Sequence, residues 1–376
     1  MFSKTLKLFT ISGFEIKVDA SWLLIATLIT WGLAKHYFPY SFAGQSTDIY
    51  LIMAIVTMLC FFASLLLHEL AHSVVARRFG IPIRGITLFL FGGVAELQAE
   101  PQSARAEFWV AIAGPVMSVT LSFGFWGLAQ ILELLQADRA VIEILSYLFL
   151  INLVLAIFNL VPAFPLDGGR ILRAYLWHRQ KNLLKATETA AKSGEIFAYV
   201  LMALGVLSLV QGALIGGVWY LMIGVFVLTA ARSSYRTQLA QSVFAHKTVG
   251  DLMTRNPLVA TPDMTLAEFV NKIMLEHRSD FVPIVEDDVL LGHLDRRILA
   301  GIGRENWTGT QVGDVFAGLD RAATISPDMS VLDLMTLIAQ TGRRKFLVTQ
   351  NAHLVGVITL ADLTDYLRFA ETLRYG

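Results

Sequence analysis

Hydrophobic residues gather in long, nearly uncharged stretches over the first 235 residues of the chain. A helix needs about 20 apolar residues to cross ~30 Å of hydrocarbon, and these stretches reach or approach that length. The predicted membrane spans are 20–38, 49–75, 106–135, 141–161, 194–211 and 213–231. The pattern therefore predicts an α-helical polytopic membrane domain with about six transmembrane helices over residues 1–235.

Basic residues between the spans indicate the orientation. They precede the first span and follow the second, fourth and sixth, whereas the opposite side of the membrane has only Lys35 and Arg139. Because loops rich in Lys and Arg remain in the cytoplasm, we expect a multi-pass protein of the cell membrane with both termini cytoplasmic. Bulky His36, Tyr37 and Phe38 follow the first span, so a cleaved signal peptide is not expected.

Residues 83–98 form an apolar segment that is too short to span as a helix. Its run of Thr, Leu and Phe favours strands, and Gly92 and Gly93 predict a turn between them. We expect a β-hairpin that dips to membrane depth. Its backbone polar groups would then need partners inside the protein, because lipid offers none.

The polar and charged positions concentrate towards the other end of the chain. Residues 243–376 carry half of the charged side chains in about a third of the length, and two segments repeat there, 248–301 and 311–370. VGDLM is matched by VGDVF, and TPDMTLAEFV by SPDMSVLDLM. Each copy predicts a short strand, a helix, two strands and a closing helix. We expect an α/β tandem module, joined to the membrane domain by a linker over 236–247.

Composition adds three constraints. Hydrophobic residues make up 55% of the chain and the mean hydropathy is +0.59, which is too apolar for an ordinary soluble protein. The formal net charge is zero, so nothing in the bulk charge favours binding of nucleic acid. The single cysteine, Cys60, excludes an intrachain disulfide framework.

The second span contains the sequence HELAH. His68 and His72 are four residues apart, so on a helix both imidazoles point the same way and can hold one metal ion. Glu69 projects from the same turn, near enough to take a proton from a metal-bound water. Ionisable side chains inside a span are costly and mark function by default. The alternative is a pair of core histidines neutralised by the carboxylate.

Zinc needs a third protein ligand, and the end of the fourth span supplies a candidate. In FNLVPAFPLDGGR, residues 158–170, Pro162 and Pro165 are expected to break the helix, and Gly168-Gly169 to free the backbone after Asp167. Asp167 would lie at the cytoplasmic depth of HELAH. It could instead simply begin a cytoplasmic loop. Asn159 could contact substrate backbone or pack between helices.

These segments resemble the site-2 protease family of intramembrane zinc metalloproteases. The resemblance rests on HELAH, LFLFGGVAEL, AIAGPVMS and FNLVPAFPLDGGR in the family's order, over about residues 15–235. It implies one zinc ion per chain bound by His68, His72 and Asp167, with Glu69 as the general base. It also implies that Asn159 contacts substrate and that the hairpin, with Gly92 and Gly93, receives substrate as an added strand. Ser118 stands where the family often has Asn, a change expected to affect helix packing and not the zinc site.

The repeats resemble a pair of cystathionine-β-synthase-type (CBS) repeats, which often bind adenine nucleotides through a G-x-x-T/S-x-x-D turn. The second repeat carries this pattern in Gly356, Thr359 and Asp362, whereas Asp295 and Ile298 occupy the corresponding places of the first. The resemblance implies ATP or AMP as a candidate ligand and a homodimer through the repeats as a candidate assembly. Thr359 and Asp362 could equally be a helix cap and its first-turn acid.

The sequence thus predicts a zinc metalloendopeptidase that cleaves membrane-spanning or membrane-associated proteins, with activity modulated by the CBS repeats. Two rival functions remain at this stage. A CBS-gated transporter or channel would spread polar residues along several spans, whereas here they cluster at one depth. A scaffold with a degenerate active site would lack one of the ligands, and none is missing.

Overall fold

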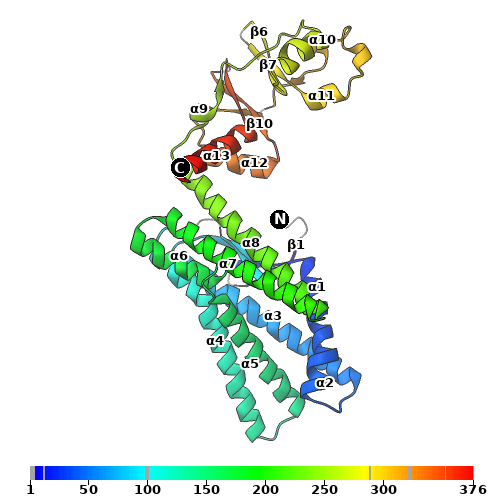
Figure 1. Cartoon of the computed structure of the whole chain (residues 1–376), viewed down its shortest axis with the longest axis vertical. Helices are drawn as coiled ribbons and strands as arrows, with labels where there is room; N and C mark the ends of the chain where they lie inside the picture. The colour runs from blue at the N-terminus through cyan, green and yellow to red at the C-terminus, as the bar shows by residue number, and fades with distance from the viewer. Residues whose placement is uncertain are drawn as a thin grey trace. The chain divides into compact units, whose positions relative to one another are not determined.

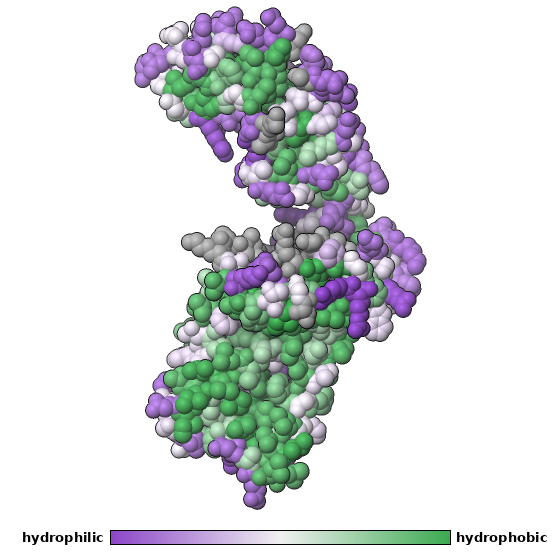
Figure 2. Space-filling model, turned by 180° about the vertical axis from the view of Figure 1, so that it is seen from behind, coloured by the Kyte–Doolittle hydropathy of each residue, from purple (hydrophilic) through white to green (hydrophobic). Residues whose placement is uncertain are grey.

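The computed structural model describes residues 5–11, 13–90, 92–97, 101–287, 289–320, 323–351 and 353–375. The chain divides into two compact units, the first unit of residues 1–236 and the second unit of residues 237–376. On the face drawn in Figure 2, hydrophobic residues cover the helices of the first unit, and hydrophilic residues predominate on the second. This contrast is the one expected for a lipid-exposed part and a water-exposed part.

The first unit consists mainly of helices (Figure 1). They are α1 (Ser21–Gly32), a π-helical segment (Leu33–Tyr37), α2 (Phe38–Ser41), α3 (Thr47–Arg78), α4 (Ala104–Leu134), α5 (Arg139–Asn159), α6 (Asp167–Gln180), α7 (Leu183–Val210) and α8 (Leu214–Phe244). Within the described ranges, five are long and apolar enough to cross a membrane: α3, α4, α5, α7 and α8. The span predicted at 20–38 falls in the helical run from α1 to α2, so the number six stays a prediction.

A four-stranded sheet packs against these helices. It contains β1 (Thr5–Ile11), β2 (Phe14–Asp19), β3 (Ile83–Phe89) and β4 (Gly92–Leu97), in that order, with β2 and β3 parallel and the other pairs antiparallel. The expected hairpin is therefore present as β3 and β4. The sequence analysis missed β1 and β2, because their basic residues were read only as markers of orientation. The sheet gives β3 the backbone partner in β2 that a strand at membrane depth requires.

The hairpin turn lies two residues earlier than predicted. Phe89 pairs with Gly92, and Leu88 with Gly93, so both glycines belong to β4. The turn begins at Leu90, and residue 91 lies outside the described residues. Gly92 has a φ of +133°, a conformation that side-chain-bearing residues rarely adopt.

The connection between α5 and α6 brings Asp167 to the start of a helix. Helix α5 ends at Asn159 and α6 begins at Asp167, so the predicted break at the prolines is present. Gly168 and Gly169 do not free the backbone, however, because both lie inside α6. A Cβ at Gly168 would lie 2.3 Å from the Leu160 carbonyl oxygen, and one at Gly169 would lie 2.3 Å from the Phe164 nitrogen. Their role is to let α6 pack directly against the 160–166 connection.

The second unit contains two small sheets and their helices. The strands are β5 (Thr254–Arg255), β6 (Phe281–Glu286), β7 (Val289–Asp295), β8 (Ala317–Gly318), β9 (Thr324–Ile325), β10 (Lys345–Gln350) and β11 (His353–Thr359). The helices are α9 (Val249–Leu252), α10 (Leu266–Glu268) with a π-helical segment (Phe269–Leu275), α11 (Arg296–Ala300), α12 (Val331–Thr341) and α13 (Leu360–Tyr375).

The two repeats share a sheet and a hydrophobic cluster. The sheets have the orders β5-β11-β10-β9 and β6-β7-β8, so the first repeat lends β5 to the sheet of the second. Phe281 and Leu290 of the first repeat pack with Leu347 and Val357 of the second. The repeats therefore share a core and form one module.

The segment 236–247, expected as a linker, is largely helical. Helix α8 continues to Phe244, and Ala240 and Phe244 belong to the core cluster of the second unit. The boundary between the units falls inside α8, at Arg236 and Thr237. The sequence analysis read polar residues after the last apolar stretch as a linker, but buried apolar residues at helical spacing continue the helix.

Candidate active site

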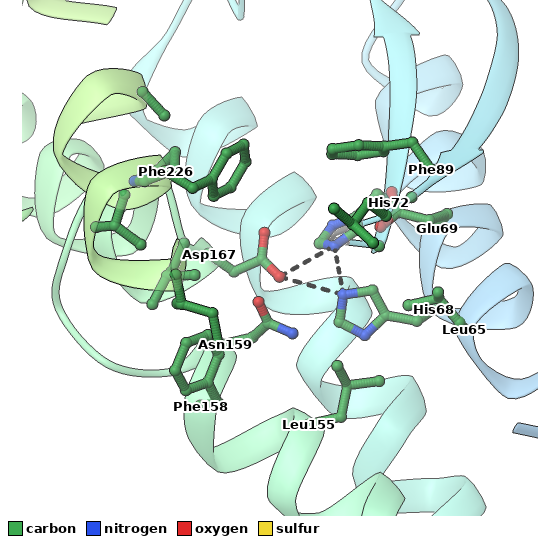
Figure 3. Close-up of a pocket in the computed structure, with 18 of the residues that line it drawn as sticks. Leu65, His68, Glu69, His72, Phe89, Leu155, Phe158, Asn159, Asp167 and Phe226 are labelled. Carbon is green, nitrogen blue, oxygen red and sulfur yellow. Dashed lines mark hydrogen bonds and ion pairs between the residues drawn. The ribbon is translucent and has the colours of Figure 1, made fainter. Parts of the chain in front are cut away.

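Three ligand-type atoms from two helices meet inside the first unit (Figure 3). Nε2 of His68 and Nε2 of His72, both on α3, are 3.2 Å apart. Asp167 Oδ2, at the start of α6, lies 3.3 Å from the first and 3.2 Å from the second. All three side chains are buried. Within the described part of the chain, this is the one group of His, Cys, Asp and Glu arranged to hold a metal ion.

The spacing of these atoms fits zinc. Ligand atoms about 2.0–2.1 Å from a tetrahedral zinc ion are about 3.3 Å from one another, and the three observed separations agree with that value. Two imidazoles and one carboxylate are also a ligand set that catalytic zinc uses, with a fourth position open. The carboxylate that the sequence analysis chose as the third candidate is the one that the fold brings to the histidines.

Helix α4 orients both imidazoles through their other ring nitrogens. His72 Nδ1 lies 2.6 Å from the Val110 carbonyl oxygen, to which it donates, and His68 Nδ1 lies 2.9 Å from Ser118 Oγ. Such outer contacts fix the tautomer and leave Nε2 free for a metal. With Ser118 in this place the three candidate ligands still come together, as expected, but the sequence analysis missed that this hydroxyl contacts one of them directly. The motif AIAGPVMS marked the right segment, but only the tertiary structure shows what Ser118 touches.

Gly114, on the same face of α4, makes room for the imidazoles. A Cβ at this position would lie 2.1 Å from His72 Nε2 and 2.6 Å from His68 Nε2. Real Cβ atoms do not approach other heavy atoms so closely, so any side chain here would displace the candidate ligands. Glycine inside a helix lowers stability, but at Gly114 only a residue without a side chain leaves space for both imidazoles.

Glu69 lies next to the ligand cluster but is not part of it. Its side chain lines the same cavity and faces the hairpin, where a Cβ on Gly93 would lie 2.5 Å from Glu69 Cγ. Strand β4 thus passes directly over this carboxylate. Glu69 therefore lies in the cavity beside the other three side chains without joining their cluster.

A cavity of about 730 Å³ opens in front of the cluster. Its size is that of an ordinary ligand site, and most of its lining is apolar. Asn159, the last residue of α5, points into it beside Asp167 and His68 (Figure 3). Phe89 of β3 and Phe226 of α8 flank it with their rings 6.3 Å apart. The sequence analysis named Asn159 and the hairpin but not α8, whose apolar residues gave no sign of a role in the site.

The surroundings of Asp167 favour the charged form of its carboxyl. Burial alone would raise the pKa of its carboxyl, but the adjacent imidazoles of His72 and His68 lower the pKa well below its usual range. Asp167 also lies in the first turn of α6, where the helix dipole favours a negative charge.

The candidate nucleotide residues form a helix cap in the second unit. The Thr359 backbone nitrogen and hydroxyl both donate to Asp362 Oδ2, at 2.8 and 2.9 Å, and the Asp362 nitrogen donates to the Thr359 hydroxyl at 3.3 Å. This reciprocal pattern is a capping box at the start of α13. In the first repeat, Asp295 caps α11 in a simpler way, by accepting from the Arg297 and Ile298 nitrogens.

Comparison with known proteins shows the family of the chain. The model of peptidase family M50 matches residues 56–137 and 127–208, and the CBS domain model matches residues 249–302 and 312–368. The protein named zinc metalloprotease Rip3, from Mycobacterium tuberculosis, is 37% identical over 96% of this chain and 93% of its own length. This chain belongs to peptidase family M50.

Two proteins of Methanocaldococcus jannaschii extend the comparison. Zinc metalloprotease MJ0392 is 30% identical to this M50 peptidase over 98% of this chain and 97% of its own length. The solved site-2 protease from that organism is 29% identical, with a TM-score of 0.43, over 62% of this chain and 95% of the solved chain.

The family membership decides the class of activity. The chain is a metallopeptidase of the site-2 protease type that carries CBS repeats, and its five apolar helices make it a multi-pass membrane protein. The transporter or channel considered from sequence is therefore not its class. The family implies zinc, and the His68, His72 and Asp167 cluster fits that ion.

Proposed function

We propose that this M50 peptidase cleaves membrane-spanning or membrane-associated proteins at a single zinc site held by His68, His72 and Asp167. The observation that carries the proposal is the near-equal spacing of the three ligand atoms, 3.2 to 3.3 Å, inside a bundle of membrane-type helices. When bound, zinc acts as a Lewis acid and acidifies water, which supplies the nucleophile for peptide hydrolysis.

Glu69 is proposed as the general base. It takes a proton from the attacking water and later returns a proton to the leaving amine nitrogen, so that the two steps balance. Its place beside the cluster and beneath β4 supports this role, because a substrate backbone next to β4 would lie within its reach. Asn159, which points into the cavity, is proposed to bind that backbone.

Strand β4 is proposed to receive the substrate as an added strand. Among the described residues β4 pairs with β3 alone, so one edge of its backbone has no strand partner there. A helical substrate must unwind before its carbonyls can be attacked, and backbone pairing at such an edge would offset the hydrogen bonds that it loses. Gly93 brings this edge close to Glu69.

The site is proposed to lie towards the cytoplasmic side. His72 precedes the end of α3, where Arg77 and Arg78 stand, by about 9 Å at 1.5 Å per residue. Basic residues at a span end favour the cytoplasmic face, which agrees with the proposal that both termini are cytoplasmic. Substrates should then be cut near their cytoplasmic ends.

The CBS repeats are proposed to bind ATP or AMP at Thr359 and Asp362 and to modulate cleavage. A nucleotide can change activity only if it binds one arrangement of the protein better than another. The expected coupling is about 1–3 kcal/mol, or a 5- to 150-fold change in apparent cleavage. A homodimer through the repeats is the alternative proposal for this module, and sedimentation with and without nucleotide distinguishes the two.

The deciding experiment measures zinc and cleavage in the same purified preparations. His68→Ala, His72→Ala and Asp167→Ala should each lower bound zinc and abolish cleavage of a single-span substrate in proteoliposomes. Glu69→Gln should keep full zinc and lose cleavage, and it should also trap its natural substrate on copurification. Full zinc occupancy in Asp167→Ala would refute the proposed third ligand.

A further inference from the structure

A buried ion pair joins α4 to α6 close to the ligand cluster. Arg173 Nε donates to Glu107 Oε1 at 2.5 Å, and Arg173 Nη2 donates to the same oxygen. Glu107 is fully buried and Arg173 is 7% exposed. The other carboxylate oxygen, Glu107 Oε2, is buried with no hydrogen-bond partner among the described residues. Among the described residues, Arg173 is thus the one hydrogen-bond partner of the Glu107 carboxylate.

Stability alone does not account for such a pair. Two charges lose their hydration when they are buried, and replacing both with apolar residues of similar volume is often neutral or stabilising. Removing one partner is strongly destabilising, because the other charge is then left unpaired. An intact buried pair therefore contributes little net stability, so its significance has to be sought in the two elements that it joins.

The Arg173 side chain contacts three segments at once. It belongs to α6, it binds Glu107 of α4, and its guanidinium lies 5.1 Å from the centre of the Phe164 ring. Phe164 is in the connection that leads into α6, and Asp167 is the first residue of that helix. Asp167 therefore lies in the chain between Phe164, whose ring the guanidinium contacts, and Arg173 itself.

The same helix α4 also holds the two histidines. Val110 accepts from His72, and Ser118 contacts His68. Helix α4 thus contacts both helices that carry candidate ligands. Its Val110 and Ser118 contact the histidines of α3, and its Glu107 binds Arg173 of α6. The Glu107–Arg173 pair therefore joins α6 to the same helix that contacts both histidines of α3.

We propose that Glu107 and Arg173 are positioning residues that place Asp167 opposite His68 and His72. They touch neither the metal nor the substrate, and they act through the location of the first turn of α6. A small shift of α6 along α4 would lengthen the 3.2 and 3.3 Å separations of Asp167 Oδ2 from the two Nε2 atoms. The inference rests on the proposed zinc site.

The test separates positioning from plain stability. The double variant Glu107→Met/Arg173→Met removes both charges at similar side-chain volume and leaves no unpaired charge. It should keep a thermal unfolding midpoint near that of the unchanged protein, yet release zinc to an excess of chelator at least tenfold faster. It should also lose cleavage rate more than substrate affinity. Release of zinc at the unchanged rate would overturn the proposal.

Two further variants keep the test decisive. Arg173→Lys keeps the charge but loses the two-nitrogen contact, so it should give faster zinc release even if the double variant does not fold. Phe38→Leu is the matched control, because Phe38 is fully buried in a cluster with Tyr50 and Met53, away from α4 and α6. It should lower the unfolding midpoint and leave zinc release unchanged. Equal zinc release from Phe38→Leu and Arg173→Lys would show a purely structural role.

Failure of this proposal is distinct from failure of the proposed function. If Asp167→Ala keeps its zinc, the third ligand is wrong whatever Glu107 does. If Asp167→Ala loses zinc while the double variant holds it as tightly as the unchanged protein, the zinc site stands and the positioning role falls.

Discussion

Ser118 Oγ lies 2.9 Å from Nδ1 of His68, across fifty positions of sequence and between two different helices. The contact leaves His68 Nε2 facing His72 and Asp167. An outer partner of this kind typically contributes 10- to 100-fold in metal affinity. A serine at this position thus keeps a polar partner for the histidine where the family often has asparagine.

Ser118→Ala should therefore weaken zinc binding about 10- to 100-fold, because the imidazole loses the group that orients it. Zinc titration against a competing chelator measures the change. Ser122→Ala is the matched control on the same helix: Ser122 is also buried and donates to the Phe149 carbonyl oxygen at 2.8 Å, but it does not touch a histidine. Equal affinity losses in both variants would count against a specific role for Ser118.

Gly114→Ala should abolish stoichiometric zinc binding. The added methyl group would meet His72 Nε2 at 2.1 Å, and the imidazoles would have to move. Gly124→Ala, also inside α4, meets nothing within 4 Å and should stabilise the helix by roughly 0.5–1 kcal/mol. Metal analysis of Gly114→Ala checks the loss of zinc, and thermal unfolding of Gly124→Ala checks the gain in stability. A fully zinc-loaded Gly114→Ala protein would show that the imidazoles are free to rearrange.

Gly93→Ala should separate catalysis from metal binding. Its Cβ would lie 2.5 Å from Glu69 Cγ, so the carboxylate must shift, and the three atoms nearest to that Cβ all belong to Glu69 rather than to a candidate ligand. Because a general base contributes about 10²–10⁴-fold, a displaced Glu69 should lower the cleavage rate by at least tenfold. Zinc content should stay at one per chain. Unchanged cleavage would mean that Glu69 keeps its function in another position.

Asp362→Ala tests the nucleotide site against its alternative as a cap. The variant removes the acceptor of the capping box and should cost about 0.5–2 kcal/mol of stability whether or not nucleotide binds. Asp295→Ala is the matched control, since it removes the cap of α11 in the first repeat, which lacks the nucleotide pattern. Calorimetric titration with ATP and AMP should show lost binding in Asp362→Ala alone. No binding by the unchanged protein at millimolar nucleotide would refute the proposed ligand.

Several features of this protein could be predicted from the sequence because they depend on local periodicity. Two histidines four residues apart share a helix face wherever that helix lies, and long apolar stretches form helices in lipid for the same reason. Short sequence patterns also predicted the hairpin and the two repeats. Asp167 was predictable as a ligand candidate because few carboxylates occur near the spans.

The tertiary structure decided what holds these groups in place. Ser118 and His68 are fifty residues apart, and Glu107 and Arg173 are sixty-six apart, so no periodic pattern connects them. The role of Gly114 depends on how closely α4 approaches α3, and the role of Gly93 on how β4 crosses Glu69. Such contacts arise from packing between elements, which depends on the shape of the whole bundle. The sequence by itself determined which groups can carry the chemistry, and packing alone decided which neighbours orient them.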